Sequence, residues 1–419
     1  MASVSRSFRT HVGFLGRRNV GKSSVLNALT RQDVAIVSPT PGTTTDPVEK
    51  PMELLPLGPV LFVDTAGVDD EGALGAQRIA KTRKVLERLD VALLVAESGA
   101  WGPFEEALLA EIRSRALPCV VVLNKSDLAA GDPALAARLA AEAVPAVAVS
   151  ATTGAGVDDL RRALLAAAPS DLLEGRRIVG DLVSAGDVVV LVTPIDAEAP
   201  KGRIILPQVQ ALRDLLDEGA ISVVVREHEL APALAALARA PKLVVTDSQA
   251  FRLVDTVTPP DVLLTSFSIL FARFQGDLAE MVRGLAGIDR LKAGDRVLVA
   301  EACTHHPVGE DIGRVKLPRW IRERAGVPLE FETVQGRDFP DDLSPYALVV
   351  HCGSCMGNRR EMLSRILRCR AASVPVTNYG LAIAYSLGIL ERALGPFPEA
   401  LEAFRAERAP ASDPEEVPA

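Results

Sequence analysis

The sequence predicts an α/β fold with three domains. Short apolar runs rich in valine and leucine alternate with helical segments along most of the 419 residues. Near-continuous apolar strands that alternate with helices are typical of parallel sheets covered on both faces. The length of the chain and its 48% hydrophobic residues are enough for two or three separate cores.

The first domain is expected over residues 1–172. Its strand candidates are HVGFLG, VLFVDTAG, VALLVAE, CVVVLNKSD and AVAVSA. Helical segments are expected between them at Lys22–Thr30, Leu74–Leu89 and Phe104–Arg115. Charged residues, glycine and proline interrupt the pattern over residues 168–183, which indicates a domain boundary.

Two smaller α/β domains are expected to follow. The second, residues 178–261, has the strand candidates VVVLVTPI, ISVVVRE and KLVVTD. An exposed sheet edge in so small a domain invites pairing, so we expect it to make the chain a homodimer or a higher homo-oligomer. The third, residues 262–406, has the strand candidates RVLVAEA, LEFETV, ALVVHCG and VPVTNYG. The acidic, proline-rich tail, residues 407–419, is expected to be disordered.

Charge and cysteine content narrow the class of protein. The net charge of −8 argues against broad electrostatic binding to nucleic acid or to an anionic membrane. No apolar run reaches the ~20 residues of a membrane helix, and the first residues do not match a secretory signal. Five cysteines form an odd, sparse set that fits a reducing compartment. We therefore expect a cytoplasmic protein that binds neither membrane nor nucleic acid.

The segment GRRNVGKS, Gly16–Ser23, follows an expected strand and opens an expected helix. It matches the loop G-x-x-x-x-G-K-[ST], whose glycines let backbone N–H groups wrap the phosphates of a nucleotide. Lys22 supplies a positive charge to the β and γ oxygens, and Ser23 can ligate Mg²⁺. The motif predicts a nucleotide site formed by Gly16, Asn19, Val20, Gly21, Lys22, Ser23 and Ser24.

Three further motifs end later strand candidates and favour guanine as the base. DTAG, residues 64–67, offers Asp64 to hold Mg²⁺ through water and the Gly67 N–H to the γ-phosphate. In NKSD, residues 124–127, Asp127 can accept hydrogen bonds from two guanine donors that adenine lacks. SATTG, residues 150–154, can meet the guanine O6. We expect a GTPase with Lys22, Asp64 and Gly67 as catalytic residues, and a base pocket formed by Asn124, Lys125, Asp127, Ser150 and Ala151.

The order and spacing of these motifs resemble the translation-factor-like GTPases, most of all the TrmE/Era group. The resemblance implies a Ras-like P-loop domain in which GTTTD is switch I and Thr44 ligates Mg²⁺, with Thr43 and Thr45 as alternatives. Asn19 stands where potassium-activated relatives hold K⁺, and a loop-stabilising contact is its alternative role. Val68 replaces the water-positioning glutamine of other GTPases, so we expect slow hydrolysis.

Cysteine and histidine gather at the ends of two strand candidates in the third domain. They are Cys303, His305 and His306 after the first, and His351, Cys352 and Cys355 after the second. Parallel strands end at one edge of a sheet, so these side chains can converge. Thiolates with imidazole suit zinc or an iron–sulfur cluster, and three thiolates with an uncertain fourth ligand suit a 4Fe–4S cluster. A Cys₃His zinc site and a redox dithiol are the alternatives. Cys119 and Cys369 are expected to be small buried hydrophobes.

A C-x-H segment and a later H-C-x-x-C segment, on a chain that begins with a TrmE-like GTPase domain, resemble the HydF family of FeFe-hydrogenase maturation factors. The resemblance implies a GTPase, a dimerisation and a cluster-binding domain. It assigns a 4Fe–4S cluster to Cys303, Cys352 and Cys355, with His305 and His351 as candidate fourth ligands. It also implies a scaffold or carrier that assembles the precursor of the two-iron subcluster with two radical SAM maturases and delivers it to apo-hydrogenase.

The alternative is a TrmE/Era-like GTPase of RNA modification or ribosome assembly, with a structural zinc site in its C-terminal domain. The acidic balance and the absence of a basic, aromatic-rich module count against this alternative.

Overall fold

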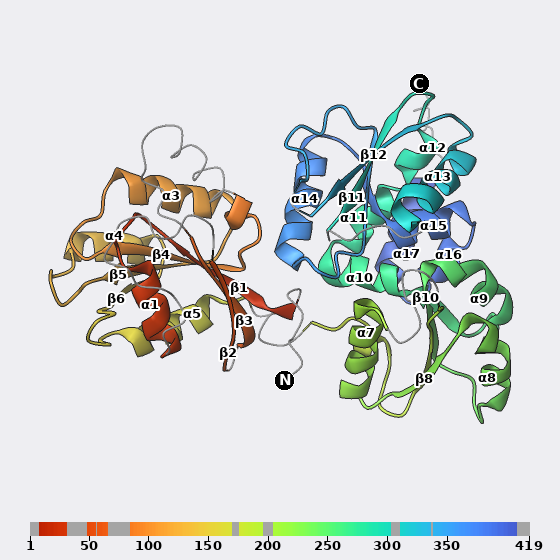
Figure 1. Ribbon diagram of the computed structural model, residues 1–419, viewed down its shortest axis with the longest axis horizontal. Coiled ribbons are helices and arrows are strands. Elements are labelled where there is room, and N and C mark those ends of the chain that lie inside the picture. Colours follow the sequence, from red (N-terminus) through yellow and green to blue (C-terminus); the bar gives the residue numbers. More distant parts are fainter. Residues whose placement is uncertain are drawn as a thin grey trace, which may run out of the picture. The chain divides into compact units, whose positions relative to one another are not determined.

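The computed structural model describes residues 8–31, 48–55, 57–65, 84–169, 176–195, 204–302, 311–336 and 338–408. The chain divides into two compact units, residues 1–176 and 177–419. Figure 1 shows the first unit in red to yellow and the second in green to blue, each with helices packed around sheets. The three predominantly parallel sheets confirm the predicted α/β fold class.

The first unit is built on one six-stranded sheet with the order β2-β3-β1-β4-β5-β6. Only the edge strand β2 is antiparallel within this described part of the unit; the other pairs are parallel. The strands are β1 (Thr10–Leu15), β2 (Val48–Leu54), β3 (Gly58–Asp64), β4 (Val91–Glu97), β5 (Cys119–Asn124) and β6 (Ala146–Ala148). The helices are α1 (Lys22–Thr30), α3 (Pro103–Ser114), α4 (Pro133–Ala141) and α5 (Val157–Ala167).

Helices cover both faces of this sheet because side chains alternate along each strand. Val12 and Phe14 of β1 belong to the core beneath α1 and α5. Leu15 of the same strand belongs to the core beneath α3 and α4. Figure 1 shows α1 and α3 on opposite sides of the sheet. With both faces covered, the loops that follow β1, β3 and β5 are left at the edge where parallel strands end.

The second unit contains two four-stranded sheets, both parallel. The middle sheet has the order β10-β9-β7-β8 and the C-terminal sheet the order β12-β11-β13-β14. The strands are β7 (Val188–Val192), β8 (Ile221–Val225), β9 (Leu243–Thr246), β10 (Leu263–Ser266), β11 (Arg296–Glu301), β12 (Glu330–Gln335), β13 (Leu348–His351) and β14 (Val376–Asn378). The helices are α7 (Leu206–Asp217), α8 (Leu230–Ala236), α9 (Phe251–Val257), α10 (Phe267–Gln275), α11 (Leu278–Arg283), α12 (Ala286–Asp289), α13 (Leu317–Ala325), α14 (Arg359–Ala371), α15 (Tyr379–Ser386), α16 (Leu390–Ala393) and α17 (Pro398–Arg408).

The middle sheet shows two features of interest. Strand β10 lies beyond the boundary expected at residue 261, yet it pairs with β9 and completes the middle sheet. Strand β8 forms the opposite edge and exposes apolar side chains, with Ile221 at 51% and Val224 at 43% of their surface. An apolar edge strand of this kind is suited to pairing with another chain.

A half-buried carboxylate, Asp214, fixes the start of the second unit. Asp214 on α7 accepts hydrogen bonds through Oδ2 from the backbone N–H groups of Ile178, Val179 and Gly180, at 2.9, 2.8 and 2.7 Å. A Cβ at Gly180 would approach Glu218 Cγ to 2.6 Å, so this segment packs tightly on the helix. None of the helices in the described ranges has the length and apolar character that a membrane crossing needs.

Candidate functional site: a nucleotide loop and a cysteine edge

The phosphate-binding loop uses backbone conformations that only glycine adopts easily. Gly16 has a φ of 139° and Gly21 a φ of 88°. A Cβ at Gly16 would lie 2.1 Å from the carbonyl oxygen of Val95, and one at Gly21 would lie 2.4 Å from Asn124 Nδ2. The loop is therefore packed directly against the ends of β4 and β5. Asn19 also belongs to this loop, has a left-handed φ of 61° and is exposed.

Lys22 and Ser23 begin α1 below this loop. The Lys22 ammonium is 7% exposed and donates to the carbonyls of Gly16 and Arg17, at 3.1 and 2.7 Å. Ser23 Oγ donates to Asp64 Oδ2 at 2.6 Å. Burial raises the pKa of Asp64, and the Ser23 hydrogen bond and the Lys22 charge oppose that rise. Asp64 Oδ1 is buried and makes no hydrogen bond. A hydroxyl beside a carboxylate with an unused oxygen is a donor set suited to Mg²⁺.

Asn124 joins the phosphate-binding loop to the SATTG loop, which is predicted to contact the base. It is 2% exposed, its Nδ2 donates to the Val20 carbonyl at 2.9 Å, and its Oδ1 accepts from the Ala151 N–H at 3.2 Å. One side chain at the end of β5 thus connects the phosphate loop with the SATTG loop. The sequence predicted Asn124 as a nucleotide-binding residue; the structure shows in addition that it holds three motifs together.

The other residues predicted for the base pocket follow strands β5 and β6. Lys125 has a left-handed φ of 62° and forms an ion pair with Glu97 at the end of β4. Asp127, the residue predicted to select guanine, is exposed. Ser150 is 1% exposed, and its Oγ accepts from the Thr153 N–H at 3.2 Å, which shapes the SATTG turn.

Several predicted residues lie outside the described ranges. They are Thr43, Thr44, Thr45, Gly67 and Val68 in the nucleotide domain, and Cys303, His305 and His306 in the C-terminal domain. Their roles remain predictions.

The cysteine segment lies where the sequence places it, at the carboxyl ends of neighbouring strands. Strands β11 and β13 are paired, with Ala300 opposite His351. The Cys352 N–H donates to the Ala300 carbonyl at 2.9 Å, and the Ala302 N–H donates to Cys352 Sγ at 3.1 Å. The residue before Cys303 therefore contacts the sulfur of Cys352. Burial raises the pKa of the Cys352 thiol, against the effect of the N–H groups of Ala302 and Ser354.

His351 is held by two hydrogen bonds. It is buried, and Arg365 Nη1 lies 2.8 Å from its Nε2. A guanidinium can only donate, so Nε2 accepts and Nδ1 carries the proton that bonds the Cys352 carbonyl at 2.9 Å. Burial, together with the charge of Arg365, lowers the pKa of His351 to about 3. In this arrangement neither nitrogen offers a lone pair to a metal, which argues against His351 as the fourth ligand.

The remaining described cysteines differ in their surroundings. Cys355 is half-buried and follows Cys352 by three residues, across a turn in which Ser354 takes a φ of 52°. Burial raises the pKa of the partly buried Cys119 and of the buried Cys369 to about 12, which indicates unreactive thiols. Within the described ranges no three His, Cys, Asp or Glu side chains converge on one metal position. Cys303, the third predicted thiol ligand, is outside those ranges.

Comparison with protein families resolves the origin of this combination. Residues 178–276 match the hydrogen maturase F dimerization domain and residues 279–396 match the hydrogen maturase F tetramerization domain. Together the two matches cover just over half of the chain. The chain belongs to the hydrogen maturase F (HydF) family. Residues 11–125 match the 50S ribosome-binding GTPase family, so this HydF chain carries a GTPase domain for GTP, GDP and Mg²⁺ together with domains for homo-oligomerisation.

Several GTPases among the curated relatives match a little over a third of this chain. The tRNA modification GTPase MnmE of Methylobacterium radiotolerans is 39% identical over 165 residues, which are 39% of this chain and 34% of that protein. GTPase Der of Wolinella succinogenes is 38% identical over 164 residues, 37% of this chain and 35% of that protein. The chain thus spans about a third of the length of these relatives. A crystal structure of Era with MgGDPNP and a 16S ribosomal RNA segment is 22% identical, with a TM-score of 0.35 over 55% of this chain and 98% of that chain.

Proposed function

We propose that this HydF chain is a GTP-hydrolysing scaffold that holds a 4Fe–4S cluster at the ends of β11 and β13. In the cytoplasm it would assemble the two-iron subcluster precursor with two radical SAM maturases, or deliver that precursor to apo FeFe-hydrogenase. The observation that carries the proposal is the 3.1 Å contact between the Ala302 N–H and Cys352 Sγ, because it brings the chain leading into Cys303 against the second predicted ligand.

The chemistry of this edge fits an iron–sulfur cluster. Cys352 is a half-buried thiol that already accepts backbone N–H groups, and such donors stabilise cluster sulfurs. A Cβ at Gly353 would lie in ordinary contact with Phe271 of α10, at 3.5 Å, so the cysteine loop packs on that helix. Thiolate ligands with N–H donors around them are typical of cluster sites, whereas hard cations prefer oxygen.

A buried amide on α10 gives a second indication. Gln275 is fully buried, and neither its Oε1 nor its Nε2 has a hydrogen-bond partner. At 100° per residue it lies between Phe271, which contacts Gly353, and Ser268, which accepts from Asn378 Nδ2 at 3.0 Å. Both contacts are to the carboxyl ends of β13 and β14, so Gln275 lies on the face of α10 turned to this edge. An unsatisfied buried amide there suits a site that receives a polar group.

The chain's own residues support a division of labour. On the nucleotide side, Lys22 binds the β- and γ-phosphates, Ser23, Asp64 and Thr44 hold Mg²⁺, and Gly67 orients the γ-phosphate through its N–H. Asp127 selects guanine, and Asn19 is the site for K⁺. On the other side, Cys303, Cys352 and Cys355 would hold the cluster, with His305 as the candidate fourth ligand. The cluster supplies an iron centre with a replaceable position. Slow hydrolysis suits a switch, since γ-phosphate contacts order and release switch loops.

The test is the metal content of anaerobically purified, iron- and sulfide-reconstituted protein. The parent chain should be brown and hold iron and acid-labile sulfide in equal amounts. The Cys352→Ala/Cys355→Ala variant should lose both, while Cys369→Ala, a buried cysteine of the same unit, should keep both. Colourless protein with stoichiometric zinc would overturn the cluster assignment and favour a structural zinc site. GTP hydrolysis should be the same in all these variants, because the cysteines lie in a separate unit.

A further inference from the structure

A buried glutamate of α3 reaches back to the phosphate-binding loop. Glu105 is the third residue of α3, its side chain is 1% exposed, and its Oε2 accepts from the Gly102 N–H at 3.0 Å. Arg17, the second residue of the phosphate-binding loop, grips the same carboxylate. Its Nε donates to Oε1 at 2.7 Å and its Nη2 to Oε2 at 3.0 Å. The guanidinium also lies 5.1 Å from the ring centroid of Phe104.

The backbone of Arg17 holds the phosphate-binding lysine. Its carbonyl oxygen accepts from Lys22 Nζ at 2.7 Å, a shorter contact than the one to Gly16. Arg17 is therefore fixed at its side chain by Glu105 and presents its carbonyl to Lys22. A bidentate arginine–carboxylate pair defines orientation as well as distance, so the position of the Arg17 carbonyl depends on Glu105.

We propose that Glu105 is a positioning residue for GTP hydrolysis, acting through Arg17 to hold the Lys22 ammonium where the γ-phosphate needs it. No sequence motif of the GTPase identifies Glu105, which is 88 residues from Arg17. Without the carboxylate, Arg17, whose side chain is already 38% exposed, turns to solvent and its carbonyl is free to shift. Because charge on the γ-phosphate develops in the transition state, a displaced Lys22 lowers the rate of hydrolysis more than it weakens binding.

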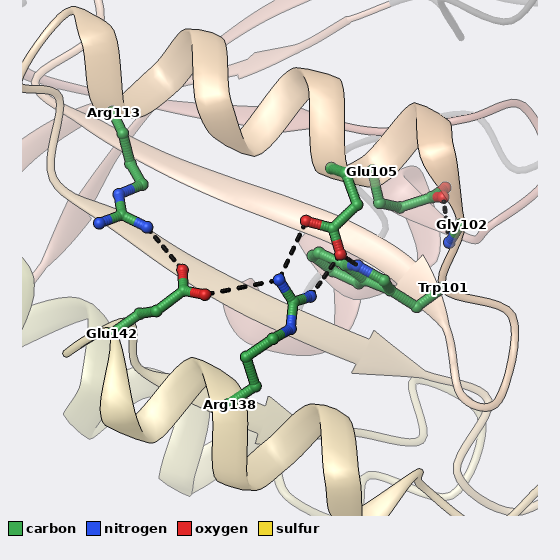
Figure 2. Close-up of polar contacts among 7 residues, drawn as sticks. Trp101, Gly102, Glu105, Arg113, Arg138 and Glu142 are labelled. Carbon is green, nitrogen blue, oxygen red and sulfur yellow. Dashed lines mark hydrogen bonds and ion pairs between the residues drawn. The ribbon is translucent and has the colours of Figure 1, made fainter.

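The neighbouring residue supplies a matched control. Glu106 follows on the same turn of α3 but is 43% exposed and pairs with Arg138 of α4. Figure 2 shows Arg138 reaching from α4 to the start of α3 and to Glu142, with Arg113 on the far side of Glu142. The described contacts of Glu106 go to Trp101 and Arg138, on the outer surface, and not to the phosphate-binding loop.

The experiment compares Glu105→Gln with Glu106→Gln in the full-length chain. Glutamine keeps an oxygen for the Gly102 N–H, so the helix start is retained while the charged pair is lost. We expect the single-turnover rate of GTP hydrolysis to fall about tenfold in Glu105→Gln, with a change in KM below about threefold, and to stay within about twofold of the parent in Glu106→Gln. Thermal midpoints are measured alongside.

A double-mutant cycle with Arg17→Met separates positioning from folding. If Glu105 acts only through Arg17, the Arg17→Met/Glu105→Gln double variant should hydrolyse GTP no more slowly than the slower single variant. Equal rates in Glu105→Gln and Glu106→Gln would overturn the proposal, as would additive losses in the cycle. A fall in the thermal midpoint of Glu105→Gln with an unchanged rate per folded molecule would also overturn it, since the pair would then serve stability alone.

Discussion

Asn124 and Asp127 belong to one four-residue motif, yet the structure predicts that only a change at Asn124 lowers the stability of the fold. Asn124 is buried and bonds the Val20 carbonyl and the Ala151 N–H. Asn124→Ala removes both hydrogen bonds. A buried group that loses its partner costs about 1–3 kcal/mol. Val20 is 4% exposed and Ala151 is half-buried, so most of this loss in stability comes from the unpaired Val20 carbonyl. We expect a loss of about 2–3 kcal/mol in the free energy of unfolding of the nucleotide-free first unit.

The assay uses the distribution of tryptophan. The chain has two, Trp101 in the first unit and Trp320 in the second. In a Trp320→Phe background, the fluorescence of Trp101 follows urea unfolding of the first unit alone, and linear extrapolation gives its free energy. Measurements without nucleotide and without Mg²⁺ separate the fold from ligand binding, because a ligand that binds only the folded state raises apparent stability.

Asp127→Asn is the control. Asp127 is exposed, so we expect its replacement to leave the free energy of unfolding within about 0.5 kcal/mol of the parent. The same change should weaken GTP binding and admit xanthine nucleotides, which present the complementary acceptor. If Asn124→Ala unfolds at the parent's urea midpoint with the parent's slope, the loop-joining role assigned to Asn124 is refuted and its effect is on the nucleotide alone.

Three further predictions follow from buried groups. Asp64→Asn should abolish Mg²⁺-dependent hydrolysis yet raise the thermal midpoint of the ligand-free first unit by a few degrees, because a buried carboxylate with an unpartnered oxygen is removed. With pKa values raised to about 12, Cys119 and Cys369 carry a thiolate fraction of about 10⁻⁴ at pH 8, so mass spectrometry should find them unalkylated by iodoacetamide until urea unfolds the chain. Asp214→Ala should lower the free energy of unfolding of the second unit, followed by Trp320, by about 2–4 kcal/mol, since three backbone N–H groups lose their acceptor.

Strands that are continuous apolar runs were predicted from the sequence, whereas β2 and β10, which are not such runs, were missed. Apolar runs identified the parallel strands of all three sheets except β10, whose four residues LLTS directly precede helix α10. The edge strand β2 reads VEKPMEL, with alternating exposure and Pro51 at its centre, so it lacks the signature of a buried strand. Helix α1 begins and ends where predicted because the phosphate motif fixes its first residue.

The site residues that the sequence predicts belong to contiguous motifs, and those it misses depend on contacts between distant segments. The phosphate loop and the base motifs are contiguous, so their residues could be predicted from the sequence alone. The Arg17–Glu105 pair joins segments that only the folded sheet brings together, and a lone glutamate in a helix carries no signal. His351 shows the same limit, because both its ring nitrogens are engaged by contacts that the local sequence does not predict. The bond to Arg365 accounts for the histidine.

In this HydF chain, the nucleotide site and the proposed cluster site each contain a metal-ligand candidate whose ionisation burial opposes. Asp64 ends β3 and Cys352 directly follows β13, and burial raises the pKa of each. Burial disfavours the charged form of such a group. A bound cation offsets this desolvation, so cation binding strongly stabilises the charged form. The buried ligand therefore makes the metal-free protein less stable and the metal-bound protein more so. In the first unit that cation is Mg²⁺, which arrives with the nucleotide. In the second unit, the same reasoning would apply to the iron–sulfur cluster proposed above, with Cys352 as the ligand whose charge the cluster offsets.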